Sequence, residues 1–365
     1  MKTNKIAVLV SFSGQGGVER SFALLVNEIV ALGVEVDLLL IKRKSPHLAA
    51  LSPAVNQIPL KRQHAATCVN YLRQEAPQAL LVAKHRAMLA ALKARKKAGT
   101  NTPITGVIGI NVTQSLAHRS RFQRWHWGRL MRQEYPKLDG IIAVSEGVRE
   151  DLLTKTGMPA DRITAIKNPV TTVEMIREAQ MPVDHPWLSK NFEEPVLITV
   201  GRLTKNKDHQ TLLEAFRLIT EKVPSRLLIL GEGPERARLE KIIAETGLAD
   251  RVQLPGFVDT PWAWMAKSSV FVLSSFAEGS GNVLTEAMAV GTPVVSTDCP
   301  SGPSEMLDGG RIAPLVSVGD AKALAAACID VLNSGIAPSL LDEAVAPFKA
   351  EVAAKHYLAF MNISV

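Results

Sequence analysis

Two glutamates in the stretch EGSGNVLTE, Glu278 and Glu286, have the residue type and the spacing to bind a hydroxylated ligand. A carboxylate accepts hydrogen bonds from vicinal hydroxyls such as those of a ribose or a sugar ring. We predict that Glu286 begins the helix TEAMAVG, where the helix dipole stabilises a negative charge. The turn between the two carboxylates would offer open backbone N–H groups to phosphate or sugar oxygens. Its residues are Gly279, Ser280, Gly281, Asn282 and Val283.

Two cations on another loop could serve the same ligand. The stretch VGRLTKNKD places Arg202 and Lys207 directly after an apolar segment. A guanidinium binds a phosphate as a fork and an ammonium binds it as a point charge, so the two can neutralise a diphosphate from two sides. Taken one at a time, a loop glutamate or lysine is ordinarily a solvated surface charge. The binding interpretation therefore depends on these residues occurring together in strand-loop-helix units.

A third loop, SGQGGVER, places Gly14, Gly16 and Gly17 between an apolar segment and a helical pattern. Glycines let the backbone approach a ligand, and the free N–H groups of a first helical turn attract an anion such as a pyrophosphate. The spacing GxGG differs from the dinucleotide fingerprint GxGxxG, and residues 42–44 are KRK where an NAD site uses a carboxylate. The alternative is a tight strand-to-helix turn that binds no ligand.

The elements that must position these loops form two alternating series of apolar segments and helical patterns, which is typical of doubly wound α/β domains. The first series begins with KIAVLVSF and the second with PVLITVG, and a polar, proline-rich stretch separates them. We predict a Rossmann-like domain over residues 1–170, a linker over 171–194, a second Rossmann-like domain over 195–340, and a terminal helix in 341–365 placed to pack back toward the first domain. Two such lobes joined by a linker imply a cleft between them.

The composition, with 47% apolar and 21% charged residues in a chain of 365, is that of a soluble globular protein. Residues 1–170 hold 25 Lys and Arg against 11 Asp and Glu, a net charge of +14, whereas residues 171–365 hold 17 against 24, a net charge of −7. No nucleic-acid-binding motif accompanies the basic half, so we expect no nucleic-acid partner. Cys68, Cys299 and Cys328 lack CxxC or Cys/His spacing, which argues against a zinc site and favours the reducing cytoplasm. The apolar stretch 23–41 is interrupted by four polar or charged residues, so it is not expected to span a bilayer.

Taken together, these motifs resemble those of the retaining glycosyltransferases with the GT-B fold, in particular family 4, also described as glycosyl transferases group 1. The resemblance covers nearly the whole chain, and its most specific part is the pair of glutamates followed by GTPVV. The motifs that carry it are GGVER, AVSEGVREDL, KNPV, VGRLTKNKD, GEGPER, LPGFVD, EGSGNVLTEAM and GTPVVSTDCPSGPSEML. It implies an acceptor-binding N-terminal domain and a nucleotide-sugar-binding C-terminal domain.

The resemblance also implies a role for each candidate residue. Glu286 would bind the donor ribose and Glu278 a hydroxyl of the transferred sugar. Arg202 and Lys207 would neutralise the diphosphate. Backbone around Leu254 and Gly256 would border the base, while Gly16 and Gly17 would approach the phosphate or the acceptor.

The chemistry expected from these residues needs no metal and no cofactor beyond the nucleotide-sugar donor. The chain contains no DxD pair of carboxylates that could bind a divalent cation to the leaving group. Arg202, Lys207 and helix N–H groups would stabilise the departing diphosphate instead. The family is taken to retain configuration by attack from the leaving-group face, with a diphosphate oxygen helping to deprotonate the acceptor.

One position departs from the family pattern. Many relatives have a histidine directly after the N-terminal strand that faces the donor sugar, and here TGVIGINV places Asn111 at that point. His118, seven residues further on, is the alternative candidate for that role. A surface histidine beside two arginines is the simpler interpretation of His118.

The stretch HRSRFQRWHWGRLMRQ mixes arginines with aromatic residues, a composition suited to an anionic membrane surface. The candidate contacts with membrane or acceptor are Arg121, Arg124, Trp125, Trp127 and Arg129. The alternative is an ordinary helix with its aromatics in the core and its arginines in water. We favour the membrane interpretation because family members often elongate glycans on lipid carriers at the inner leaflet.

Three functions therefore remain open. The first is a transferase that moves a hexose or N-acetylhexosamine from a nucleotide-diphosphate sugar, with UDP as the expected nucleotide, to a glycan or lipid-linked glycan in surface polysaccharide or lipopolysaccharide synthesis. The second is another GT-B enzyme, such as a nucleotide-sugar epimerase or a transferase to a small soluble acceptor. The third, a non-catalytic glycan-binding protein, is disfavoured by the intact set of charged residues. The expected location is the cytoplasm, with peripheral attachment at the inner membrane surface.

Overall fold

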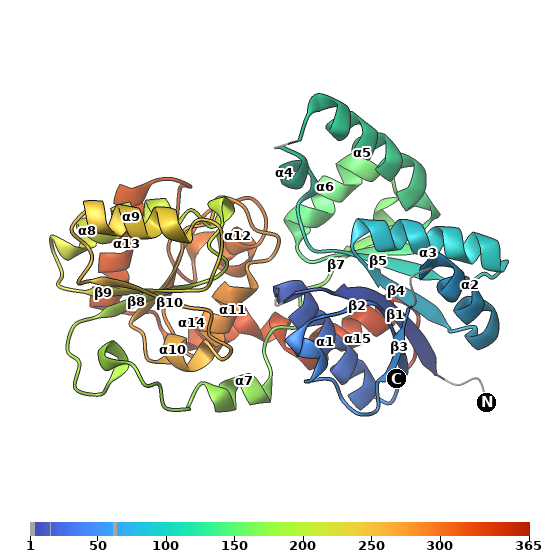
Figure 1. The fold of residues 1–365 in the computed structure, drawn as a ribbon, viewed down its shortest axis with the longest axis horizontal. Coiled ribbons are helices and arrows are strands. Elements are labelled where there is room, and N and C mark those ends of the chain that lie inside the picture. Colours follow the sequence, from blue (N-terminus) through green and yellow to red (C-terminus); the bar gives the residue numbers. More distant parts are fainter. Residues whose placement is uncertain (1–3, 15, 61–63, 118) are drawn as a thin grey trace. The chain divides into compact units, whose positions relative to one another are not determined.

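The computed structural model describes residues 4–14, 16–60, 64–117 and 119–365. The chain divides into two compact units, residues Met1–Val170 with Phe348–Val365, and residues Thr171–Pro347. Each unit is an α/β structure built on one parallel sheet (Figure 1). The chain boundary between the units therefore lies at Val170, and the chain returns to the first unit at Phe348.

The first unit contains a seven-stranded sheet in the order β3-β2-β1-β4-β5-β6-β7. Its strands are continuous apolar runs, such as ALLVA in β4 with all five residues buried, because both faces of a parallel sheet are covered. The strand order reverses between β1 and β4, which are paired through Val8 and Leu81. The strands are β1 (Lys5–Phe12), β2 (Glu35–Arg43), β3 (Asn56–Pro59), β4 (Ala79–Ala83), β5 (Ile104–Ile108), β6 (Gly140–Ala143) and β7 (Ile163–Ala165).

Helices cover this sheet with apolar faces at helical spacing. In α1, residues Phe22, Leu25, Val26 and Ile29 are buried, which is the i, i+3, i+4, i+7 pattern of an amphipathic helix. The last helix, α15, packs against α1 and adds Tyr357 to the same core (Figure 1). The helices are α1 (Gly17–Ala31), α2 (His64–Glu75), α3 (His85–Ala98), α4 (Val112–Ala117), α5 (Arg121–Glu134), α6 (Glu146–Thr156) and α15 (Ala350–Phe360).

The second unit contains a six-stranded parallel sheet in the order β10-β9-β8-β11-β12-β13. Its order reverses between β8 and β11, and in open α/β sheets ligands bind beyond the carboxyl ends of the strands at such a point. The strands are β8 (Val196–Val200), β9 (Arg226–Leu230), β10 (Val252–Gly256), β11 (Val270–Leu273), β12 (Val294–Thr297) and β13 (Leu315–Val316).

In the second unit, α8 and α13 pack together over the apolar core. Residues 171–194, expected as a linker, are part of this unit, since α7 packs on α10 and the Arg226 guanidinium lies 5.4 Å from the ring centroid of Trp187. The helices are α7 (Val173–Glu178), α8 (His209–Thr220), α9 (Arg236–Glu245), α10 (Trp262–Ala266), α11 (Asn282–Ala289), α12 (Pro303–Met306), α13 (Ala321–Ser334) and α14 (Pro338–Val345).

In the parts of the chain that the structure describes, no one helix combines the length and the apolarity needed to cross a bilayer. Helix α13 and the segment Pro338–Phe348 meet that test only as a pair, and they are bent by 120° where they join.

Candidate functional site

The loops that leave β8, β9 and β10 in the second unit are joined by backbone hydrogen bonds. The N–H of Leu203 donates to the Glu232 carbonyl at 2.9 Å, and the N–H of Gly231 donates to the Gly256 carbonyl at 2.7 Å. A Cβ on Gly231, whose φ is +137°, would lie 1.9 Å from the Gly201 carbonyl oxygen. The GEG turn therefore needs glycine there in order to support the loop that carries Arg202.

Arg202 and Lys207 lie on this first loop, as predicted, but their surroundings differ. The Arg202 side chain is exposed and makes no ion pair with any residue that the structure describes. Lys207 ends a short 3-10 helix, Lys205–Lys207, and Asp208 then adopts a left-handed conformation and caps α8. This sharp turn directs the Lys207 ammonium toward Glu278, and the two form an ion pair with Nζ and Oε1 2.6 Å apart.

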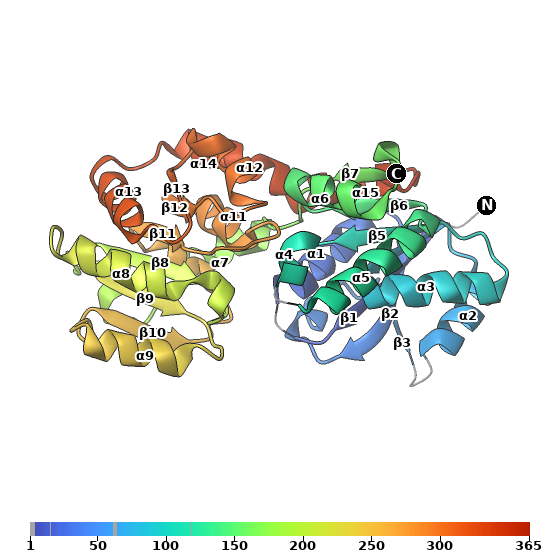
Figure 2. The ribbon, with the colours of Figure 1, turned by 90° about the horizontal axis from the view of Figure 1, so that it is seen from above.

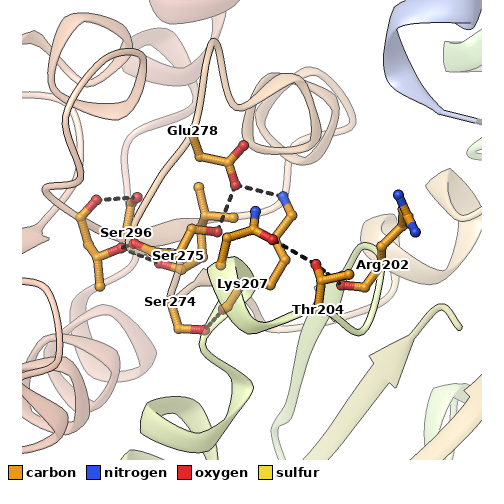
Figure 3. A network of polar contacts seen from close by, with 10 residues as sticks. Arg202, Thr204, Lys207, Ser274, Ser275, Glu278 and Ser296 are labelled. Carbon is orange, nitrogen blue, oxygen red and sulfur yellow. Dashed lines mark hydrogen bonds and ion pairs between the residues drawn. The ribbon is translucent and has the colours of Figure 1, made fainter. Parts of the chain in front are cut away.

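Glu278 belongs to a network of polar side chains on the loop that follows β11 (Figure 3). The Ser275 hydroxyl donates to Glu278 Oε1 at 2.7 Å, and the Ser274 hydroxyl donates to the Lys207 carbonyl at 2.8 Å. The side chains of Lys207 and Glu278 are only 18% and 12% exposed. Their charges are therefore partly withdrawn from water and compensate each other at the carboxyl ends of β8 and β11.

Glu286 lies in the second turn of α11, so the prediction that it begins a helix was wrong. Helix α11 begins at Asn282, directly after Gly281, which adopts a left-handed conformation with φ 71° and ψ 39°. The buried hydroxyl of Thr285, directly before Glu286, donates to the Met306 sulfur at 3.2 Å. The Glu286 carboxylate instead accepts a hydrogen bond at Oε2 from the indole Nε1 of Trp262, at 3.2 Å.

The turn between the two glutamates is backed by a second loop. Ser280 and Gly281 are buried, while Gly279, Asn282 and Val283 are half-buried. A Cβ on Gly302, whose φ is +97°, would lie 2.8 Å from the Ser280 carbonyl oxygen. The glycine of the SGPSE stretch thus permits close packing against the turn.

The expected base-binding backbone is part of this same set of loops. The Leu254 carbonyl accepts a hydrogen bond from Arg236 Nη2 at 2.8 Å, and a Cβ on Gly256 would lie 3.0 Å from Glu232 Oε1. Leu254 lines a hollow of about 470 Å³ between α9 and β10. None of the four charged candidates, Arg202, Lys207, Glu278 and Glu286, lines this hollow.

In the first unit, Gly16 and Gly17 begin α1 as predicted, but a buried carboxylate already lies in the first helical turn. Glu19 is 6% exposed and pairs with Lys84, whose Nζ lies 2.9 Å from Glu19 Oε1. Ser13 donates a longer hydrogen bond of 3.5 Å to the same oxygen. The dipole of α1 is therefore complemented from within the protein. Neither Glu19 nor Lys84 was among the residues predicted from the sequence.

Asn111 is buried and caps α4, since its Oδ1 accepts a hydrogen bond from the Gln114 N–H at 3.1 Å. This contact gives Asn111 a structural role, and its catalytic role stays a prediction. His118, the alternative, lies outside the described residues.

The arginine-rich stretch forms α5, which packs beside α6 on the outside of the first unit (Figure 2). Phe122 and Trp125 are 72% and 58% exposed, so the alternative that places the aromatics in the core is wrong for these two residues. Trp127 is half-buried, because its ring lies 4.4 Å from that of His85 on α3. The exposed candidate cations are Arg121, Arg124 and Arg129.

His85 anchors the inner side of α5. Its Nδ1 lies 2.8 Å from the Tyr135 hydroxyl, and burial together with the charge of Arg86 lowers the pKa of His85 to about 4. The imidazole is therefore neutral at physiological pH and serves here as a packing partner for Trp127.

Within the described ranges, no group of three or more His, Cys, Asp or Glu side chains converges on a point where a metal ion could bind. The three cysteines are free and buried, and burial raises the pKa of Cys299 to about 12. None of them is positioned as a metal ligand or as a thiolate.

Comparison with known proteins gives matches over both units. The family description "Glycosyltransferase Family 4" matches residues 15–174, and "Glycosyl transferases group 1" matches residues 194–334. The chain is 30% identical over 327 residues to N-acetylgalactosamine-N,N'-diacetylbacillosaminyl-diphospho-undecaprenol 4-alpha-N-acetylgalactosaminyltransferase of Campylobacter jejuni, which covers 86% of each chain. It is 29% identical over 330 residues to the lipopolysaccharide core biosynthesis glycosyltransferase LpsE of Rhizobium meliloti, covering 87% of this chain and 85% of that protein.

The fold also matches solved structures. The structure of Anabaena Alr3699/HepE in complex with UDP superposes with a TM-score of 0.77 at 19% identity, covering 98% of this chain and 99% of that one. The lipopolysaccharide outer core galactosyltransferase WaaB in its apo form gives a TM-score of 0.72 at 21% identity, with coverage of 98% and 99%. These likenesses confirm the predicted GT-B class of two parallel-sheet α/β domains.

Proposed function

Because the chain belongs to the glycosyltransferases of family 4 and group 1, we propose that it is a retaining enzyme that moves a hexose or N-acetylhexosamine from a UDP-sugar to a glycan or lipid-linked glycan. The observation that carries this proposal is the Lys207–Glu278 pair beside Arg202, at the carboxyl ends of β8 and β11. The Campylobacter relative acts on a diphospho-undecaprenol glycan, and the Anabaena structure contains UDP. The first fits a lipid-linked glycan acceptor, and the second fits a donor with a nucleoside diphosphate.

The contacts of Lys207 and Glu278 would let both side chains bind the donor while their ion pair stays intact. Both the Lys207 and the Ser275 hydrogen bonds go to Oε1 of Glu278, so Oε2 can accept a bond from a sugar hydroxyl. An ammonium has three N–H donors, so Lys207 can keep Glu278 and also bind a diphosphate oxygen. Negative charge grows on that diphosphate as the glycosidic bond breaks, and a fixed cation stabilises it without reorganisation.

Product analysis tests the proposal. Purified protein is incubated with UDP-, GDP- and ADP-sugars, with and without a bacterial lipid extract, and products are identified by mass spectrometry and by the anomeric configuration in NMR. We expect transfer from a UDP-sugar with retained configuration. Glu278→Gln should abolish transfer, whereas Glu221→Gln, in an exposed pair with Arg217, should not. Inverted product, or no consumption of any donor, would refute the proposal.

We also propose that α5 docks the enzyme on anionic lipid, where a lipid-linked acceptor would lie. The exposed Phe122 and Trp125 lie among cations, and the Arg129 guanidinium lies 5.7 Å from the centroid of the Trp125 ring system. Such interleaved aromatic and basic side chains suit the interface between headgroups and acyl chains. The net charge of +14 over residues 1–170 adds long-range attraction.

Vesicle sedimentation tests this docking. Each basic residue near an anionic surface contributes about 1 kcal/mol, so changing Arg121, Arg124 and Arg129 to Gln should weaken binding to phosphatidylglycerol vesicles about a hundredfold. Binding of the wild type should also fall as salt rises. A matched control changes three exposed cations of the second unit, Arg217, Arg238 and Lys241, to Gln. Equal binding by both triple variants, or no wild-type binding at low salt, would refute docking by α5.

A further inference from the structure

Trp262 is the first residue of α10, a short helix that packs beside α11. Its indole N–H donates to Glu286 Oε2 at 3.2 Å, across a separation of 24 residues in the chain. Trp264, two residues later, has a different environment, since its ring lies 5.2 Å from that of His185. Of these two tryptophans, Trp262 is hydrogen-bonded to the Glu286 carboxylate and Trp264 packs on His185.

A glutamate side chain has several rotatable bonds, and fixing such a side chain during binding has an entropic cost. An indole is rigid, and its nitrogen is a donor only, so it cannot compete with the carboxylate for a ligand hydroxyl's proton. A bond to one carboxylate oxygen sets the direction of the other oxygen as well, because the group is planar. Trp262 can thus keep Glu286 in one orientation before any ligand is bound.

We propose that Trp262 is a positioning residue for the donor nucleoside, and that it acts by orienting Glu286 toward the ribose hydroxyls. This inference rests on the proposed function and on the role expected for Glu286 from the family resemblance, which is to bind the donor ribose. Trp262 itself makes no step of the transfer. Its effect is confined to how strongly the hydroxyls of the nucleoside are recognised.

Calorimetry with two ligands separates this role from simple packing. Trp262→Phe keeps an aromatic ring but removes the N–H. Losing one neutral donor to a carboxylate should weaken the binding of UDP about three- to tenfold. Binding of 2',3'-dideoxy-UDP, which lacks the ribose hydroxyls, should be unchanged relative to wild type. In turnover assays the donor KM should rise by the same factor while kcat stays within about twofold, because ribose binding is equal in the ground and transition states.

The neighbouring Trp264→Phe is the matched control, and it should leave the preference for UDP over 2',3'-dideoxy-UDP as in wild type. In a Glu286→Ala background, Trp262→Phe should add no further loss. If Glu286→Ala weakens UDP binding but Trp262→Phe does not, or if Trp262→Phe weakens both ligands equally, the positioning role is refuted while the donor site stands. If Glu286→Ala leaves UDP binding unchanged, the proposed donor site fails and this inference fails with it.

Discussion

Replacing Lys207 by methionine would remove the ammonium that lies 2.6 Å from Glu278 and leave the carboxylate with the Ser275 hydroxyl beside it. Removing one partner of a fully buried ion pair costs about 3–5 kcal/mol, because the other charge stays buried without compensation. Here the side chains of Lys207 and Glu278 are still 18% and 12% exposed to solvent, so water relieves part of that cost. We therefore expect Lys207→Met to lower the free energy of unfolding of the second unit by about 2–3 kcal/mol.

A double-mutant cycle isolates the pair from other effects of the substitution. Glu278→Gln is nearly isosteric, and the double variant removes both charges together. Urea unfolding of the four proteins, followed by circular dichroism, should give a coupling energy of about 1–2 kcal/mol. The exposed pair Arg217–Glu221 is a matched control, with 50% and 57% exposure, and its coupling should stay below about 0.5 kcal/mol.

Ligand binding distinguishes the two members of the pair. Lys207→Met should weaken UDP binding about ten- to hundredfold, since a charge-assisted contact to the diphosphate is lost. Glu278→Gln should bind UDP at least as tightly as wild type, because it leaves the ammonium to the diphosphate, although turnover of the UDP-sugar should fall at least about a hundredfold in both variants. Additive unfolding energies, or an equal loss of UDP affinity in both single variants, would refute this account of the pair.

Burial, with a contribution from the charge of Lys207, lowers the pKa of His209 to about 4 in the folded protein. As the pH falls from 6.5 to 4, this imidazole is therefore protonated in the unfolded chain before it is protonated in the folded one. The contribution of His209 to the free energy of unfolding should be complete above pH 6.5 and fall by up to about 3 kcal/mol by pH 4. His209→Gln should reduce this loss, which is measured as the difference in the free energy of urea unfolding between pH 7 and pH 4.5. An equal difference in the variant and the wild type would contradict the prediction. Gly231→Ala should destabilise the protein by about 2–4 kcal/mol because its Cβ would overlap the Gly201 carbonyl, whereas Gly247→Ala, which has open space, should cost about 1 kcal/mol. Transfer should survive EDTA, and loss of turnover that magnesium or manganese restores would show that a metal ion carries the leaving group.

The parallel sheets were predictable because their strands are nearly pure apolar runs. A strand such as RLLIL in β9 is covered on both faces, so its residues need no alternation and the run is visible in the sequence. The glycine positions were visible for a related reason, since GEG follows a strand at a point where the chain must turn. What the sequence does not reveal is the contact that requires a glycine, such as Gly231 against Gly201.

The start of α11 was mispredicted because the helical turn that precedes Glu286 is not visible in the local pattern TEAMAVG. Thr285, directly before Glu286, has a hydroxyl of the type that often caps a helix. In the structure, that hydroxyl turns into the core toward Met306, and Gly281 supplies the turn four residues earlier. The side chain's direction depends on tertiary packing, which a local pattern does not contain.

The residues that orient the site were missed for a different reason, namely their distance along the chain. Trp262 is 24 residues from Glu286, and Lys84 is 65 residues from Glu19. Ser275 is the exception, because it lies three residues before Glu278 on the same loop after β11 and could have been proposed from its hydroxyl alone. Long-range partners become visible only when the fold brings their helices and loops together.

The charged side chains of the second unit differ in whether other side chains that the structure describes hold them in place: Lys207 and Glu278 are held, and Arg202 is not. Glu278 and Lys207 hold each other, with Ser275 on the same carboxylate oxygen, so little ordering remains to be done when a ligand arrives. Arg202 is exposed and has no ion-pair partner among the described residues, so a diphosphate would have to order its long side chain, at a cost of up to about 2 kcal/mol. A charge-assisted bond gains about 1.5–3 kcal/mol, which roughly offsets that cost. The net contribution of Arg202 to ground-state binding should therefore be small, and its value to a transferase would lie in the additional charge that appears on the diphosphate as the sugar leaves.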